Sequence, residues 1–173
     1  AAAQVHANRN ESHALLTNFS NAYARKVKQN GWPDLDGGGL EQIGAVDALR
    51  MLMVRVVDGV LHLFVGIPEG VPVSFRSIRV TGAFLISASN GIPRVEVISE
   101  VGRSLLILPT LFGKPGKALQ QQDELCKQNA TTLTPLTRKD EHYYELKTTA
   151  GEHLAIVPCS QLTSDGWRVL HVD

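Results

Sequence analysis

The sequence has no net charge, because its 17 basic and 17 acidic residues cancel. A neutral chain has no field that gathers polyanions or acidic membranes, so we expect no nucleic-acid partner. Its longest apolar runs also stop far short of the roughly 20 residues that a membrane-spanning helix needs. With 173 residues, the chain is long enough to bury about 70% of its unfolded surface as a single domain.

Cysteine is scarce, and Cys126 and Cys159 are the whole complement. No Cys-x-x-Cys pair occurs, which argues against a zinc site or a thioredoxin-type redox site. An even pair favours one disulfide, while two separate buried thiols are the alternative that the sequence leaves open.

Signatures of catalysis are missing as well. There is no Gly-x-Ser-x-Gly, and the basic loop at residues 113–117 lacks the first glycine and the final hydroxyl of a phosphate-binding loop. The best-placed histidines, His142 and His153, lie on two strands that we expect to pair around residues 148–151, in a register that keeps the imidazoles apart. We therefore expect no catalytic residue, no metal site and no cofactor, and we predict that the protein is not an enzyme.

One stretch has the spacing of an amphipathic helix. Between Asn10 and Asn30, apolar residues recur at intervals of three and four, which places them on one helical face. The pattern stops at Gly31-Trp32-Pro33, where glycine and proline end a helix. We expect this helix to lie on a sheet, and the side chains that make the contact are Leu15, Leu16, Phe19 and Tyr23.

The clearest local signal is Asp58-Gly59, the preferred pair for a two-residue hairpin turn. Pairing outward from this turn gives one fully apolar face that extends as far as Leu52 opposite Val65. The other face is mixed, so we expect it to be either partly covered by another element or offered to a partner. The candidate interaction residues on it are Arg55, His62 and Phe64.

Alternating apolar residues and turn signals predict a series of strands after Gly31. Their ranges are 52–57, 60–67, 75–80, 83–88, 94–98, 104–108, 142–147, 152–157 and 167–172. A short helix is predicted at 40–49, a polar segment of helical character at 118–128, and an irregular segment at 129–139. The predicted fold is α+β, with the N-terminal helix packed on a mainly antiparallel sheet. Its single domain has three parts, which are residues 1–30, 31–112 and 113–173.

This layout of a helix, an antiparallel sheet and two late cysteines resembles the soluble part of a type IV pilin, and in particular the type IVb branch. The resemblance implies that Cys126 and Cys159 form a disulfide that bounds the C-terminal region. It further implies a structural subunit of an extracellular filament, located in the periplasm, in a pilus or at the cell surface. Such a subunit assembles with other pilin-like subunits through its N-terminal helix. The chain begins at Ala1 without methionine, so a membrane contact is expected only through a missing segment upstream of it.

Two other function classes fit the same features. An extracytoplasmic sensor domain also begins with a helix and continues into a sheet. An adhesion or binding module would use the mixed face of the first hairpin, at Arg55, His62 and Phe64.

Overall fold

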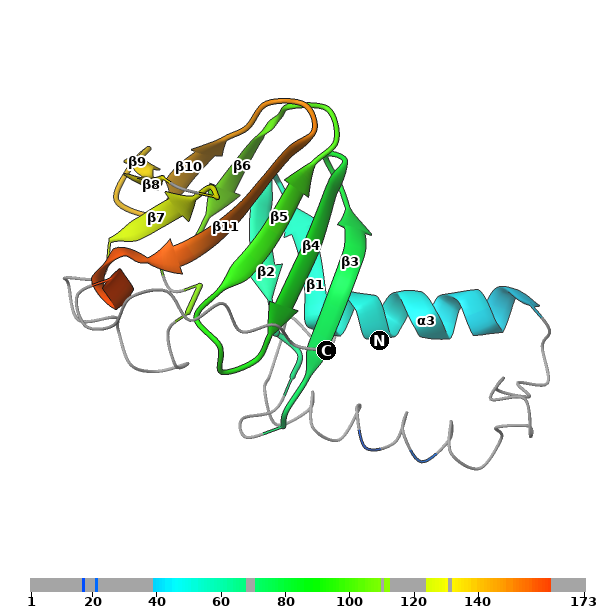
Figure 1. Cartoon of the computed structure of the whole chain (residues 1–173). Coiled ribbons are helices and arrows are strands. Elements are labelled where there is room, and N and C mark those ends of the chain that lie inside the picture. Colours follow the sequence, from blue (N-terminus) through cyan, green and yellow to red (C-terminus); the bar gives the residue numbers. More distant parts are fainter. Residues whose placement is uncertain are drawn as a thin grey trace.

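The computed structural model of the protein describes residues 39–67, 71–109, 111–112, 124–130 and 132–162, together with Thr17 and Asn21. These residues form two sheets, one with strand order β1-β2-β6-β10-β9 and one with order β3-β4-β5-β11-β7-β8 (Figure 1). Neighbouring strands are antiparallel, except that β2 and β6 are parallel. The elements are α3 (Gly39–Met53), β1 (Val54–Val57), β2 (Val60–Leu63), β3 (Ser74–Val80), β4 (Phe84–Ser89), β5 (Val95–Ser99), β6 (Ser104–Ile107), β7 (Leu125–Gln128), β8 (Leu133–Pro135), β9 (Thr137–Arg138), β10 (Tyr144–Lys147), β11 (Glu152–Pro158) and the 3-10 turn η1 (Cys159–Leu162).

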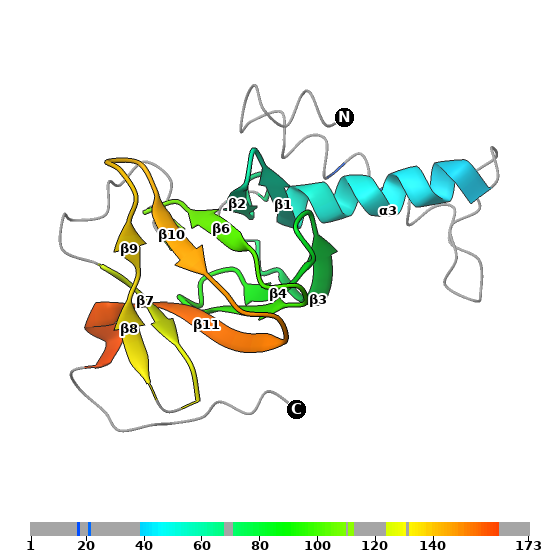
Figure 2. The ribbon, with the colours of Figure 1, turned by 90° about the horizontal axis from the view of Figure 1, so that it is seen from above.

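Each sheet has one apolar face, because apolar residues alternate along its strands. In β5, Val95 and Val97 are buried while Glu96 between them is exposed. The two sheets bury these faces against each other, and Figure 2 shows them as two layers. The shared core includes Val54, Leu61, Leu105, Ile107 and Leu146 from the five-stranded sheet and Phe75, Phe84, Ile86, Val97, Leu125 and Ile156 from the six-stranded sheet.

The predicted α+β fold is therefore wrong, because the described residues are mostly β-sheet, arranged as two packed layers. Both layers have an apolar face, so each sheet provides a surface that buries the other. The predicted amphipathic helix at 10–30 lies outside the described residues, apart from Thr17 and Asn21. The helix predicted at 40–49 is confirmed as part of α3. This helix joins β1 at its C-terminal end and extends away from the sheets in Figures 1 and 2.

The β1–β2 hairpin is confirmed in type and in register. Asp58 and Gly59 have the positive φ angles of 51° and 79° that this tight turn requires. The pairs around it include Val56 opposite Leu61 and Val54 opposite Leu63. The predicted pair of Leu52 and Val65 is wrong, because Leu52 is the second-last residue of α3 and β2 ends at Leu63.

The second predicted hairpin, between residues 142–147 and 152–157, does not form. β10 pairs with β6 and β9 in one sheet, while β11 pairs with β5 and β7 in the other. Residues 148–151 thus carry the chain from one layer to the other instead of turning it back within a sheet. The β5–β6 connection makes the same crossing beside it, because Ser99 pairs with Glu152 in one sheet and Ser104 with Lys147 in the other.

Three short strands, β7, β8 and β9, occupy segments that we predicted to be helical or irregular. Leu125 and Cys126 are both buried in β7, on opposite faces of the sheet. Polar residues precede and follow these two positions, so the sequence shows no apolar pattern that would predict burial on both faces. The predicted last strand at 167–172 lies outside the described residues.

Candidate functional site

The structure brings two of the three predicted interaction residues together. Arg55 in β1 lies directly opposite His62 in β2. Both side chains are partly buried, and the loss of solvent lowers the pKa of Arg55. Phe64 does not join them, because it follows the end of β2 with a positive φ of 53°. The centroid of its ring lies 5.6 Å from that of Phe75, and the side chain packs against the core.

Apolar residues surround the Arg55–His62 pair on the outer face of the five-stranded sheet. Val57 and Val60 lie on the same side of the hairpin as Arg55 and His62, because alternate residues of a strand share a face. Leu106 of β6 lies beside Val60 in the neighbouring parallel strand. Val57 is 38% exposed, whereas Val60 is buried. We call these five residues (Arg55, Val57, Val60, His62 and Leu106) the β1–β2–β6 outer face.

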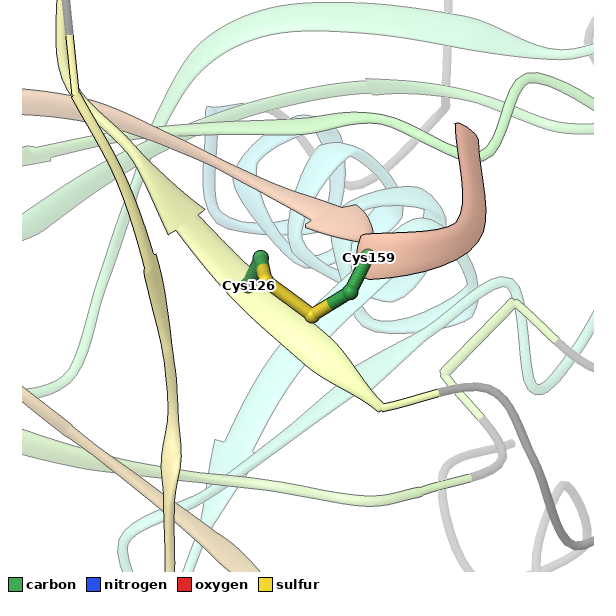
Figure 3. The surroundings of a disulfide bond; sticks show 2 residues. All are labelled: Cys126 and Cys159. Atoms are coloured by element: carbon green, nitrogen blue, oxygen red, sulfur yellow. A yellow bond between two sulfur atoms is a disulfide. The ribbon is translucent and has the colours of Figure 1, made fainter. Parts of the chain in front are cut away.

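Cys126 and Cys159 form a disulfide, with their Cα atoms 5.2 Å apart, which confirms the predicted pairing. Figure 3 shows the bond joining β7 to the residue that follows β11. The Cys159 amide also donates a hydrogen bond to the Glu124 carbonyl at 2.7 Å. On the outer side of the six-stranded sheet, Cys126 packs with Ala155 and Val157 in a small cluster separate from the main core.

At the start of β11, the end away from the disulfide, Glu152 forms a polar network that joins the two sheets. Its Oε1 atom lies 2.5 Å from Lys127 Nζ and accepts a bond from Asn129 Nδ2 at 3.2 Å. Its Oε2 atom accepts the Thr149 amide at 2.9 Å. Lys127 Nζ also reaches the carbonyl of Lys147 in the other sheet, at 3.2 Å. Through Lys127, this network links β11 and β7 of one layer to β10 of the other at one end of the sandwich.

Burial and hydrogen bonding shift the pKa of Glu152 in opposite directions. Burial raises its pKa, while the bonds from Lys127, Thr149 and Asn129, with the positive charge of Lys127, lower it by more. The net pKa of Glu152 is below the ordinary value, so the carboxylate is the form that the network holds.

The β5–β6 and β10–β11 connections, which both cross between the sheets, are joined by hydrogen bonds at Ser99, whose side chain is fully buried. Ser99 Oγ accepts the Gly102 amide at 3.2 Å and lies 2.6 Å from Thr148 Oγ1. The Ser99 carbonyl accepts the Gly151 amide at 2.7 Å. Gly102 has φ +69°, and a Cβ there would lie 2.7 Å from the backbone nitrogen of Ala150. The two connections therefore touch with no space for a side chain.

The predicted helix-packing residues lie outside the described residues; they are Leu15, Leu16, Phe19 and Tyr23. The two histidines that we considered are exposed, His153 in β11 and His142 in the turn before β10. In the part of the chain that the structure describes, no three metal-ligating side chains come together. Within those same ranges, no helix has the length and apolar content needed to cross a bilayer.

Sequence reasoning missed the Glu152 network. One signal for it is present, because Glu152 lies two and four residues before Leu154 and Ile156, which both face the core. A carboxylate on the buried side of a strand requires partners. The sequence alone does not name Lys127 and Asn129, because the strand that contains Lys127 and ends just before Asn129 was not predicted.

No protein-family model matches the chain, and no curated protein matches its sequence significantly. Function is therefore inferred from the residues themselves.

Proposed function

We propose that this chain is an extracytoplasmic module that acts through contact with other proteins. The observation that supports this location is the disulfide between Cys126 and Cys159. Disulfides form and persist in oxidising compartments, whereas cytosolic thiols are kept reduced. A sandwich with such a crosslink provides a rigid support for a contact surface.

The location is tested by the thiol state in cells that make the protein from its own gene. Acid-quenched cells are treated with a maleimide-linked polyethylene glycol before and after reduction. We expect the protein outside the cytoplasm, with no thiol reacting before reduction and two reacting after it. Two reactive thiols before reduction would refute the proposal.

The contact surface that we assign to this module is the β1–β2–β6 outer face. It combines a partly buried arginine with apolar side chains, and arginine and apolar groups are the residues that protein interfaces favour. Val57 leaves part of the apolar area open to a partner, since it is 38% exposed.

A photoreactive phenylalanine analogue at position 62 tests this surface in the native cell fraction. The matched control places the same probe at Lys139, an exposed residue in the turn between β9 and β10. We expect a crosslinked protein from position 62 alone, and we expect Arg55→Glu to remove it. Equal crosslinking at both positions would mean that the β1–β2–β6 outer face is not the contact surface.

A filament subunit is the second candidate, and the disulfide is the specific observation in its favour. Cys126 and Cys159 are bonded where the resemblance to type IV pilins puts a disulfide. The partners would then be other pilin-like subunits. Electron microscopy of sheared surface material, with antibody to this chain, is expected to show labelled filaments. If the protein is present in that fraction and no filament carries label, an adhesion or sensor module is the function that remains.

A further inference from the structure

The helix α3 passes into β1 without a connecting residue, since α3 ends at Met53 and β1 begins at Val54. Figures 1 and 2 show the helix leaving the sandwich at the side where β1 and β3 are the outermost strands. A helix of 15 residues is about 22 Å long. A tilt of about 20° at the junction would therefore displace Gly39, the far end of α3, by about 8 Å.

Backbone hydrogen bonds tie the end of α3 to the chain that follows β2. The last carbonyls of a helix have no partner within the helix itself. In α3, the Met53 carbonyl accepts the Phe64 amide at 2.7 Å, and the Leu52 carbonyl accepts the Gly66 amide at 3.3 Å. These bonds continue the ladder of the β1–β2 hairpin past its last residue pair. The end of α3 is thus joined to the five-stranded sheet on both sides of the junction.

Side-chain packing at the junction is equally close. Leu52 is buried, and Met53 packs against the main core. A Cβ atom at Gly66 would overlap Cδ2 of Leu52 and would lie 3.2 Å from its Cβ and Cγ atoms. Gly66 therefore leaves the space that Leu52 fills, and any larger residue there would have to displace the whole leucine side chain.

A further contact joins α3 to the other sheet. Arg50 lies in the last turn of α3, and its Nη1 atom donates to the Arg79 carbonyl of β3 at 3.4 Å. The same guanidinium is held on the helix by Asp47, whose Oδ1 atom lies 2.8 Å from Nε and 2.7 Å from Nη2. A hinge needs residues whose backbone can absorb a rotation. At this junction the backbone is bonded to one sheet, and a side chain one turn earlier is bonded to the other.

We infer that α3 is a rigid arm of the sandwich, held at a fixed angle by contacts of Leu52 with Gly66 and of Arg50 with β3. Gly39 then keeps one position relative to both sheets. A rotation or pull applied at the start of α3 is passed to β1 and β3 together, instead of being absorbed at a hinge. The inference goes beyond the proposed contact function, because it concerns how movement at the start of α3 reaches the sandwich and needs no outside partner.

Distances between pairs of spin labels on the full chain, measured by pulsed electron resonance with the disulfide intact, test the arm. Val46→Cys places one label on α3, where the side chain is 63% exposed, and Glu96→Cys places the other on the exposed side of β5. We expect a distance distribution as narrow as that of a control pair within the sandwich, at positions 96 and 139. A Gly-Ser-Gly insertion between Met53 and Val54 gives the reference for a free hinge. A wild-type distribution as broad as that of the insertion variant would overturn the inference.

Two substitutions test the contacts that we assign to the junction. In Gly66→Val and in Arg50→Leu, we expect the distribution between positions 46 and 96 to broaden or its mean to move by about 4 Å, the displacement of Val46 for a tilt of about 20°. Gly44→Ala is the matched control in α3, since a Cβ atom there meets no neighbour, and it should keep the wild-type distribution.

The label pair at positions 96 and 139 shows in each variant whether the sandwich is intact. With that pair unchanged, a wild-type distance between positions 46 and 96 in both Gly66→Val and Arg50→Leu would overturn the role of these contacts. Because no partner protein enters these measurements, their failure is distinct from a failure of the proposed function.

Discussion

Removal of the disulfide should cost a large part of the stability of this protein. The crosslink joins residues 33 positions apart, for which the chain-entropy relation gives about 3.8 kcal/mol at 25 °C. The perturbation is Cys126→Ala with Cys159→Ala, since alanine puts no unpaired hydroxyl into the cluster beside Ala155 and Val157. For a chain of this size, the loss corresponds to a fall in Tm of about 8–15 °C.

Urea unfolding followed by circular dichroism measures the free energy of unfolding of the wild type and the variant. We expect the midpoint to fall and the slope with urea to rise, because the unfolded chain without the crosslink exposes more surface. The wild type in reductant is the control and should unfold at the same urea concentration as the variant. A loss below about 1 kcal/mol, or a reduced wild type that keeps its oxidised midpoint, would refute an entropic role for this bond.

Three further predictions concern the contacts at the crossing end of the sandwich. The pKa of Glu152 is lower in the folded state than in the unfolded chain, so the carboxylate stabilises the fold above its unfolded pKa and this stabilisation is lost as the pH falls through the folded pKa. The difference in unfolding free energy between wild type and Glu152→Gln should therefore be largest near neutral pH and shrink in acid, and a constant difference from pH 7 downward would contradict this sign. Gly102→Ala should destabilise the fold by about 2 kcal/mol or more in thermal unfolding, because the positive φ strains any other residue and Ala150 leaves no room for a Cβ atom. Gly91→Ala is the control for backbone strain alone, since a Cβ atom there meets no neighbour at a comparable φ. Thr148→Val should cost about 1–3 kcal/mol because it removes a partner of the buried Ser99 hydroxyl, and an unchanged Tm would show that Ser99 is satisfied without it.

The sequence was sufficient to predict those turns and strands whose structure is decided by residues close to one another in the chain. Asp58-Gly59 specifies its turn, and the turn sets the register of Val54 and Val56 against their partners. The strands β3 to β6 were predicted within one or two residues, because their alternation and turn residues are local signals.

The layer to which each strand belongs was not predictable from local signals. Residues 148–151 contain the threonines and glycine of an ordinary hairpin turn, yet they carry the chain across the sandwich. The residues that hold this segment in its crossing path are distant in sequence, because they are Ser99 and Gly102 of the β5–β6 connection. For the same reason, Arg55 and His62 were correctly paired through their own hairpin, whereas the partners of Glu152 come from a strand hidden among polar residues.

The position of β11 has a consequence for how the chain is made. β11 follows the other described strands in sequence, yet it lies in the interior of its sheet between β5 and β7. While the ribosome is still adding residues before Glu152, β5 and β7 have no strand between them and cannot complete a common sheet. The six-stranded sheet is then completed only after synthesis has passed Pro158, since the contacts of β11 with β5 and β7 join segments far apart along the chain. The order of strands in space therefore makes Glu152–Pro158 the segment whose synthesis completes this layer.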